Sequence, residues 1–335
     1  MKILITGSAG FIGYHLAEKL LKKKKNKIVG IDNLNNYYDV KIKKKRNNIL
    51  KKNKNFIFNK LDIVESHKIE KLFKKYKFDF VFHLAAQAGV RYSIDFPRKY
   101  IDSNVVGFFN IIENSKKYQV KRLFYASSSS VYGENKNFPL KENEKIYPKN
   151  IYGLSKKVNE EISYIFNKFY NLKLTGLRFF TVYGEWGRPD MMIVKFISSF
   201  FNKSTFKLYN FGNHTRDFTY VDDIVEGVYR CCQKPSVSLT CFDPKIPNPS
   251  ASLAPYRIFN IGNNRPVELL YFINLLEKKI GKKANMKFVP LPPGDVVETA
   301  ADINLLENWI GFKPSTSIEE GVEKFLSWYF EFYGI

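Results

Sequence analysis

Several features that would restrict the location or chemistry of this chain are scarce in its sequence. There are only three cysteines, Cys231, Cys232 and Cys241. Their spacing does not fit a metal site, and three are too few for a disulfide framework. No apolar run is long enough to cross a membrane. The short apolar stretch at the N-terminus is interrupted by glycines, so it predicts a strand rather than a signal peptide. We therefore expect a cytoplasmic protein with no metal site.

Acidic residues are also scarce, with 32 Asp and Glu against 54 Lys and Arg and a formal net charge of +22. An excess of this size can favour nucleic acid or anionic membranes as partners. The lysine clusters at 22–25, 43–46 and 51–54, however, contain little arginine and no interleaved aromatic residues. We therefore expect a solvated lysine surface with no nucleic-acid and no membrane partner. An anionic small-molecule substrate would also benefit from such a field.

Strand and helix patterns alternate through the first half of the 335-residue chain, which is 44% hydrophobic and long enough for one large domain or two closely packed ones. This alternation predicts an α/β fold, a Rossmann-type doubly wound parallel sheet over residues 1–180 with its ligand at the carboxyl ends of the strands. The expected strands are Lys2–Thr6, Lys27–Ile31, Phe56–Lys60, Phe80–His83, Arg122–Ala126 and Leu172–Arg178. The expected helices are Phe11–Leu21, Glu65–Tyr76, Val105–Tyr118 and Ser155–Tyr170.

Beyond residue 180 the alternation loosens, and glycine, proline and aromatic residues become frequent. We expect residues 181–335 to form mainly a smaller, discontinuous C-terminal substrate domain. Two segments, 208–233 and 256–263, are expected to return to the first domain. The first of these contains a strand followed by a helix with Asp222 or Asp223 as its predicted cap.

Three glycines, Gly7, Gly10 and Gly13, separate the first strand from the first helix. Glycine there permits a tight turn and lets backbone N–H groups approach a pyrophosphate at the helix N-terminus. Asp32 ends the second strand, where an acid can accept hydrogen bonds from the adenosine ribose hydroxyls. Its charge would repel a 2′-phosphate, which favours NAD over NADP. Asp62 either lies near the adenine amino group or caps a helix.

Tyr152 and Lys156 are four residues apart and therefore share one helix face. An ammonium group nearby is expected to lower the phenol pKa from its usual value of about 10, which would make Tyr152 a general base. The strand that ends in "FYASSSSVYG" precedes this pair. A hydroxyl at its end can bind the substrate oxygen that Tyr152 deprotonates.

The motifs "TGSAGFIG", "HLAAQ", "SSSSVYG", "YGLSK" and "RDFTYVDD" occur in this order. With them the chain resembles the extended short-chain dehydrogenase/reductase superfamily, and within it the nucleotide-sugar epimerases and dehydratases. The resemblance implies a catalytic set of Ser128, Tyr152 and Lys156, a UDP- or dTDP-sugar oxidised transiently at C4, and tightly held NAD. It also implies a homodimer formed through the helices at 105–118 and 155–170.

The sub-class is indicated by differences within these motifs. Similar 4,6-dehydratases have Asp–Glu after the active-site Thr, whereas this chain has Ser129 and Ser130, which disfavours dehydration. Three stretches, 35–46, 85–93 and 178–192, resemble UDP-glucuronate 4-epimerases, which implies formation of UDP-galacturonate for surface polysaccharide. Three alternatives stay open: an oxidative decarboxylase of UDP-glucuronate, a 4-epimerase of neutral or N-acetylated UDP-hexoses, and a non-catalytic basic NAD-binding protein.

Oxidation of a glucuronate at C4 gives a β-keto acid that loses CO₂ readily, so an epimerase must fix the carboxylate. Arg188 matches the position that the resemblance gives this role, and the planar guanidinium suits it. Arg216 is expected to bind the diphosphate or to pair with Asp217 or Asp222, and Arg91 to bind substrate or fix a loop. The resemblance implies that Tyr152 and Lys156 also contact the cofactor. The other implied cofactor positions are Phe11, Ile12, Asn33, Ile63, Leu84, Ala85 and Ala86. The other implied substrate positions are Gln87, Ser127, Ser129, Ser130, Thr181, Asp295 and, more weakly, Asn260.

Three further residues are expected to be structural. Asn104 is expected to support the active-site helix, His83 to be a satisfied core histidine, and Trp186 to be a packing anchor.

Overall fold

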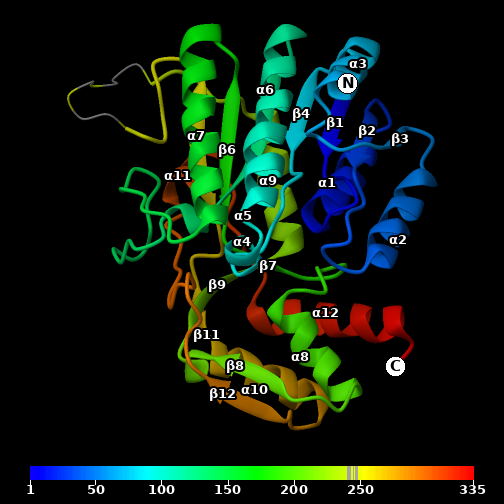
Figure 1. Ribbon diagram of the computed structural model, residues 1–335, viewed down its shortest axis with the longest axis vertical. Helices are drawn as coiled ribbons and strands as arrows, with labels where there is room; N and C mark the ends of the chain where they lie inside the picture. The colour runs from blue at the N-terminus through cyan, green and yellow to red at the C-terminus, as the bar shows by residue number, and fades with distance from the viewer. Residues whose placement is uncertain (240–242, 244, 246–247) are drawn as a thin grey trace.

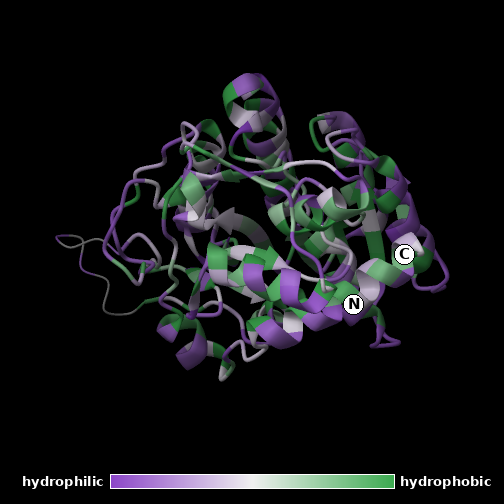
Figure 2. Ribbon diagram, turned by 90° about the horizontal axis from the view of Figure 1, so that it is seen from below, coloured by the Kyte–Doolittle hydropathy of each residue, from purple (hydrophilic) through white to green (hydrophobic). Residues whose placement is uncertain are grey.

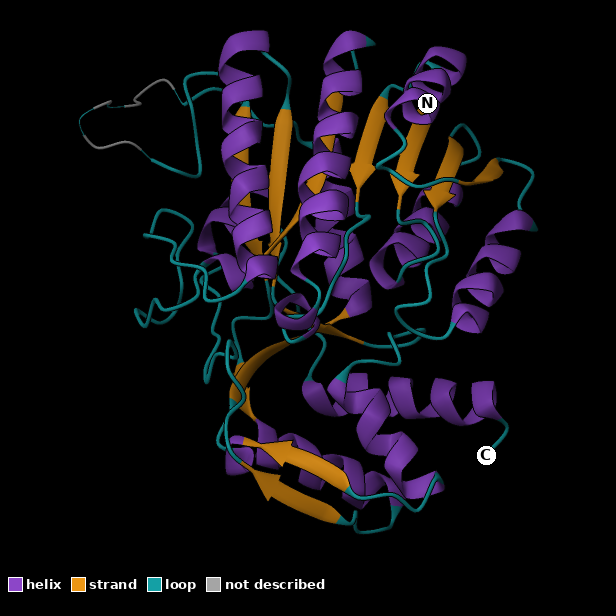
Figure 3. Ribbon diagram, in the orientation of Figure 1, coloured by secondary structure: helices purple, strands orange, loops and turns teal. Residues whose placement is uncertain are grey.

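A computed structural model describes residues 1–239, 243, 245 and 248–335, so Cys241 lies outside the described residues. Within these residues, seven parallel strands form the central sheet in the order β10–β6–β5–β4–β1–β2–β3 (Figure 3). The order proceeds outward from β1 in both directions, which confirms the doubly wound Rossmann-type sheet. The strands are β1 Lys2–Thr6, β2 Lys27–Asp32, β3 Phe56–Lys60, β4 Phe80–His83, β5 Arg122–Ser128, β6 Leu174–Phe179 and β10 Tyr256–Ile261.

Helices cover both faces of this sheet (Figure 1). On one face α3 (Ser66–Tyr76) packs against α6 (Gly107–Lys117), and α6 against α7 (Ile151–Tyr170). On the other face α1 (Phe11–Leu21) packs between α2 (Val40–Lys51) and α9 (Val221–Gln233). The outer helices alternate hydrophilic and hydrophobic residues, as expected for helices that bury one face (Figure 2). In the described part of the chain, none of the helices is long and apolar enough to cross a membrane.

The structure changes several expected boundaries. α7 begins four residues earlier than predicted because Asn150 caps it, accepting a hydrogen bond from the Gly153 N–H at 2.8 Å. The helix expected at 105–118 is divided into a π-helix, η1 (Ile101–Val106), and α6. The prediction that Asp222 or Asp223 caps α9 is wrong, since Tyr220 occupies the cap and both acids lie in the first turn. The α2 helix was not predicted.

The smaller part of the molecule lies beyond the carboxyl ends of the central strands (Figure 1). It contains two small sheets with the strand orders β11–β9–β7 and β12–β8. Their strands are β7 Thr181–Tyr183, β8 Phe206–Tyr209, β9 Thr215–Tyr220, β11 Pro266–Glu268 and β12 Met286–Val289. The elements of the whole chain that have not yet been given are the short helices α4 Tyr92–Asp95 and α5 Pro97–Tyr100, the helices α8 Met192–Phe201, α10 Leu269–Ile280, α11 Asn304–Ile310 and α12 Ile318–Tyr333, and the 3₁₀ turns η2 Ser129–Val131 and η3 Asn210–Gly212.

Of the segments expected to return to the first domain, 256–263 does so through β10, whereas 208–233 does so only through α9. β10 pairs with β6 in the central sheet, and α9 packs on α1. β9 instead pairs with β7 and β11 in a small sheet. The division into two domains stays a prediction.

Candidate active site

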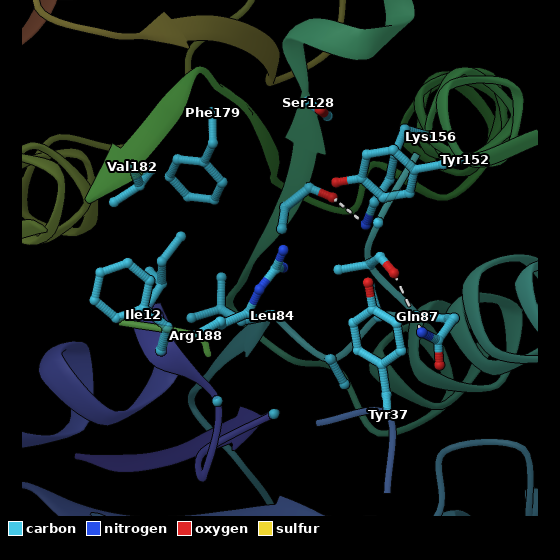
Figure 4. Close-up of a pocket in the computed structure, with 18 of the residues that line it drawn as sticks. Ile12, Tyr37, Leu84, Gln87, Ser128, Tyr152, Lys156, Phe179, Val182 and Arg188 are labelled. Carbon is cyan, nitrogen blue, oxygen red and sulfur yellow. Dashed lines mark hydrogen bonds between the residues drawn. The ribbon is translucent and has the colours of Figure 1, made fainter. Parts of the chain in front are cut away.

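The predicted site residues meet in a cavity of about 440 Å³ at the carboxyl ends of the central strands (Figure 4). A second cavity of about 590 Å³ adjoins it, and the predicted residues that line both are Thr181, Arg188, Arg216 and Asp295. Arg91 borders only the second cavity. The other predicted residues that line the first are Gly7, Gly10, Phe11, Ile12, Gly13, Asp32, Asn33, Asp62, Ile63, Leu84, Ala85, Ala86, Gln87, Ser127, Ser128, Ser129, Ser130, Tyr152 and Lys156.

The glycine turn forms one wall of the first cavity. Gly7 has a φ of +70°, and a Cβ there would lie 2.8 Å from the backbone N of Ala85. A Cβ on Gly13 would overlap the carbonyl oxygen of Gly7. Gly10 precedes α1 and supplies no side-chain cap, so the first backbone N–H groups of the helix remain available to a ligand. This geometry fits a bound diphosphate.

Asp32 lies at the end of β2, beside a buried lysine that sequence reasoning missed. Burial raises the pKa of the Asp32 carboxyl, while the Lys43 ammonium and the Leu34 N–H, 2.8 Å from Oδ1, oppose that rise. Lys43 also lines the cavity, and its Nζ donates to the Asn35 carbonyl oxygen at 2.8 Å. The lysine-rich run around Lys43 gave no signal that this ammonium would be buried.

Asp62 does not cap α3, because Glu65 occupies the cap position. Its carboxylate instead accepts hydrogen bonds from Asn33 Nδ2 at 2.7 Å and from the Val64 N–H at 3.1 Å. The helix-cap alternative for Asp62 is therefore wrong. Both Asn33 and Asp62 face the cavity.

The catalytic candidates come from β5 and α7. Ser128 ends β5, and α7 carries Tyr152 and Lys156. The expected net lowering of the Tyr152 pKa is wrong for this structure. Burial raises that pKa, although a hydrogen bond with Ser128 and the charge of Arg188 act against the rise. Lys156 Nζ is directed to the Ala126 carbonyl oxygen at 2.8 Å, and burial lowers the pKa of Lys156 to about 8. Tyr152 therefore retains its proton here.

A buried ion pair behind the cavity corrects the role expected of one serine. The Ser127 hydroxyl donates to Glu160 Oε1 at 2.6 Å, and Arg178 holds both oxygens of Glu160 at 2.9 and 2.8 Å. Because a hydroxyl has only one proton, Ser127 cannot donate to a substrate while it holds Glu160, although it lines the cavity as one of the predicted substrate positions.

Asn104 supports α7 as expected, since its Nδ2 donates to Ser155 Oγ at 3.0 Å. His83 is buried and pairs through Nδ1 with Thr6 Oγ1 at 2.9 Å, as expected of a core residue. Its Nε2 has no hydrogen-bond partner among the described residues, so the expectation of a satisfied histidine is wrong for that nitrogen. Trp186 packs its ring against those of Trp328 and Phe332, which confirms that it is a packing anchor.

Arg188 points its guanidinium toward the middle of the cavity, where the Tyr37 hydroxyl also points (Figure 4). Two parallel hydrogen bonds join Arg188 to Asp190: Nε to Oδ1 and Nη2 to Oδ2, both 3.1 Å long. Tyr37 and Asp190 lie in the stretches 35–46 and 178–192 that carry the resemblance. Neither was singled out within them, because no local pattern shows that the two meet in the fold.

The other two arginines hold loops at the second cavity. Arg216 donates to the carbonyl oxygens of Val296 and Val297 and forms no ion pair within the described residues, so the alternative pairing with Asp217 or Asp222 is wrong. Burial lowers the pKa of Arg216 to about 10. Arg91 pairs with Asp295, Nη2 to Oδ2 at 2.7 Å, and lies 3.8 Å from the Tyr209 ring centroid.

Asn260 does not reach the site. It is fully buried, and its Nδ2 donates to the carbonyl oxygens of Leu140 and Asp302 at 2.8 and 3.1 Å. Neither cavity is lined by this residue, so the prediction of a substrate contact is wrong.

Residues 4–325 match the family model described as GDP-mannose 4,6 dehydratase. The chain belongs to this family. It is similar to Protein CapI of Staphylococcus aureus, with 48% identity over 99% of each chain. It is also similar to a probable UDP-glucuronate 4-epimerase of Rhizobium meliloti, with 39% identity over 98% of this chain and 97% of that one.

The solved structures agree with this family membership. The UDP-glucuronic acid 4-epimerase of Bacillus cereus, in complex with UDP-glucuronic acid and NAD, has 31% identity and a TM-score of 0.88. The match covers 99% of this chain and 100% of that chain. The resemblance stated from the motifs is therefore confirmed at the level of family and fold.

Proposed function

We propose that this chain catalyses the NAD-dependent 4-epimerisation of a UDP-sugar, converting UDP-glucuronate reversibly to UDP-galacturonate. The observation that carries the proposal is the single cavity in which the glycine turn, Asp32, the Ser128–Tyr152–Lys156 set and Arg188 meet. The wall formed by the glycine turn and Asp32 thus shares one cavity with the phenol of Tyr152 and the guanidinium of Arg188. The similarity to UDP-glucuronate 4-epimerases supports the choice of sugar.

NAD fits the residues present at the glycine turn and β2. The open N–H groups at the start of α1 would hold its diphosphate, and the Asp32 carboxylate would accept hydrogen bonds from its ribose hydroxyls. When bound, NAD would supply the hydride acceptor for C4 of the sugar and the source of the hydride that is returned to C4. Asp32 would repel the additional phosphate of NADP.

Tyr152 takes the proton of the sugar C4 hydroxyl, and Ser128 holds that oxygen by a hydrogen bond. Since burial raises the Tyr152 pKa, forming the phenolate requires nearby positive charge. Lys156 and Arg188 supply it; with a pKa of about 8, Lys156 is still mostly protonated at neutral pH. After the 4-keto sugar has rotated and its other face has been reduced, Tyr152 returns the proton to the same C4 oxygen.

Arg188 binds the sugar carboxylate and keeps the C5–C6 bond out of line with the C4 ketone π system, so that CO₂ is not lost. Arg216 and Asp295 border both cavities, which supports a diphosphate near Arg216 and the remainder of UDP in the second cavity. Ser129 and Ser130 lack the carboxyl groups that dehydration needs, although the family model is described as a dehydratase.

We also propose a cytoplasmic homodimer that acts in surface polysaccharide synthesis. The support for a dimer is a group of large apolar side chains on α6 and α7 that stay exposed in the single chain. Phe109 is 41% exposed, Ile165 47% and Phe169 70%. Burial of these faces against a second copy would form a four-helix bundle.

The test is NMR of the products formed from UDP-glucuronate by the purified protein with no added NAD. UDP-galacturonate with its carboxylate retained supports the proposal. A UDP-pentose with CO₂ as the main products would reject the epimerase in favour of the decarboxylase. Turnover of UDP-glucose or an N-acetylated UDP-hexose alone would favour a 4-epimerase of neutral or N-acetylated UDP-hexoses. No sugar turnover, together with salt-dependent binding of structured RNA, would favour the non-catalytic protein.

A further inference from the structure

We propose that Asp190, held in place by Tyr37, is a positioning residue that sets the orientation of Arg188 and thereby keeps the oxidised uronate from losing CO₂. The inference rests on the proposed function, since it concerns the carboxylate of the same substrate. On this proposal Asp190 and Tyr37, which lie outside the catalytic set, determine how much of the oxidised sugar is epimerised and how much is decarboxylated.

The contacts of Arg188 leave one edge of its guanidinium free. Its Nε and one Nη2 hydrogen donate to the two oxygens of Asp190. Within the part of the chain that the structure describes, no hydrogen bond is made by Nη1. The end formed by Nη1 and Nη2 can therefore donate two parallel hydrogen bonds to a second carboxylate. The Arg188 side chain is 26% exposed and that of Asp190 17%, so solvent competes little with this pairing.

Tyr37 holds Asp190 by a hydrogen bond from a distant part of the sequence. Its hydroxyl donates to Asp190 Oδ2 at 3.1 Å across 153 residues of sequence. The Tyr37 ring lies 4.9 Å from that of Tyr92, and its hydroxyl fills space where a Cβ on Gly89 would have to lie. Burial and the Asp190 charge raise the Tyr37 pKa, so the hydroxyl keeps the proton that it donates.

The main chain that carries Arg188 is anchored as well. Arg46, fully buried on α2, donates through Nη2 to the carbonyl oxygens of Trp186 and Gly187. Its Nη1 donates to the Ala9 carbonyl oxygen at 2.8 Å, within the glycine turn. Backbone and side chain of Arg188 are thus both restrained relative to the cofactor wall, as a site that must fix an angle requires.

Charge alone does not explain Asp190. A second carboxylate beside Arg188 reduces the positive potential and weakens attraction of an anionic sugar. Orientation does explain it, because two fixed hydrogen bonds define the plane of the substrate carboxylate. If that plane turns, the electron pair of the C5–C6 bond can move toward the C4 carbonyl as CO₂ leaves. A proton from water then adds at C5 and gives a 4-keto-pentose nucleotide.

The experiment compares Asp190→Asn and Tyr37→Phe with the unchanged enzyme. For UDP-glucuronate it measures kcat, KM, the Kd by calorimetry and the pentose fraction of the products; UDP-glucose serves as the neutral ligand. Glu226→Gln and Tyr271→Phe are matched controls. The first breaks an arginine–carboxylate pair and the second a tyrosine–carboxylate hydrogen bond, both outside the two cavities.

For Asp190→Asn we expect kcat to fall about tenfold, the scale of a small misplacement of a reacting group, and the pentose fraction to rise. The Kd for UDP-glucuronate should stay the same or tighten, because a negative charge has been removed. Tyr37→Phe should change the same quantities in the same direction by less, and Asp190→Glu should recover part of the loss. Both controls should behave as the unchanged enzyme.

Two results would overturn the inference. One is an Asp190→Asn enzyme with unchanged kcat and product partition. The other is a weaker Kd with an unchanged partition, which would mean that Asp190 only maintains the fold of the loop. If Asp190→Asn does not fold, the partition measured for Tyr37→Phe decides. Failure of the unchanged enzyme to form UDP-galacturonate would instead overturn the proposed function itself, so the two failures are distinguishable.

Discussion

The two walls of the cavity are built in different ways. The cofactor wall comes from short contiguous motifs at the carboxyl ends of β1 to β4, where glycine conformation and strand geometry place each group. The substrate wall comes from loops far apart in sequence, joined by side chains such as Tyr37, Arg46 and Asp190. The first wall follows from local backbone chemistry, whereas the second depends on long-range hydrogen bonds. The predictions below separate the two.

The largest effect is expected from removing the Tyr152 hydroxyl, which lies in the cavity that both walls line. Tyr152→Phe should lower kcat by about 10²- to 10⁴-fold, the usual range for loss of a general base. Bound NAD, measured after denaturation of the purified protein, should be unchanged, because the phenol is not needed for the glycine turn. If Tyr152→Phe interconverts the two uronates at the rate of the unchanged enzyme, the proposed mechanism is wrong.

A change confined to the cofactor wall should remove NAD while leaving the substrate wall intact. Gly13→Ala places a Cβ against the Gly7 carbonyl, so the turn must open and copurified NAD should be largely lost. The control is Gly281→Ala, at a φ of +74° but with open space around it. This control should cost about 1 kcal/mol of stability and no NAD. Full NAD occupancy in Gly13→Ala would contradict the role of the turn.

On the substrate wall, Arg188→Ala should separate charged from neutral sugars. The value of kcat/KM for UDP-glucuronate should fall about 10- to 100-fold, as expected when a charge-assisted hydrogen bond is lost. Any turnover of UDP-glucose should change by much less, which makes it an internal control. An equal loss for both sugars would show that Arg188 does not act through the carboxylate.

The contrast between the walls explains which residues of the site could be predicted from the sequence. Gly7, Asp32 and the Tyr152–Lys156 pair were predicted to lie in one site, because strand ends and a four-residue spacing determine where they point. The α2 helix was missed since its run of lysines conceals a helical repeat, although Ile42, Arg46 and Leu50 lie four residues apart and are all buried. That spacing was the available signal.

Other features of the site had no such signal. Ser127 donates to Glu160, 33 residues away, and Tyr37 meets Asp190, 153 residues away. Only the fold brings these partners together, so no local pattern predicts them. The net rise of the Tyr152 pKa could not be predicted from the sequence either. It depends on how much burial outweighs the charges of neighbouring groups, and Lys156 points to a backbone carbonyl.

The smallest effect expected is that of pH, acting through Lys156. Burial lowers its pKa to about 8, so between pH 7 and pH 9 the charged fraction of Lys156 should fall roughly tenfold. Because the pKa of Tyr152 is raised above this range, its phenolate fraction should rise roughly 100-fold over the same interval. Since the reaction needs both charged forms, kcat/KM should rise only about tenfold and level off above pH 8. A rise of about 100-fold that continues to pH 9 would contradict a requirement for the ammonium.

The same burial makes the charged lysine a cost to folding. Its pKa in the folded chain lies below the value near 10.5 in the unfolded chain. The cost is therefore fully present below about pH 8 and disappears as pH rises past the unfolded value. Lys156→Met should unfold at the same or a higher temperature than the unchanged enzyme at pH 7, and this difference in unfolding temperature should vanish above pH 10. A variant that is less stable at pH 7 would show that the hydrogen bond to Ala126 outweighs burial of the charge, and that the ammonium stabilises the fold as well as serving catalysis.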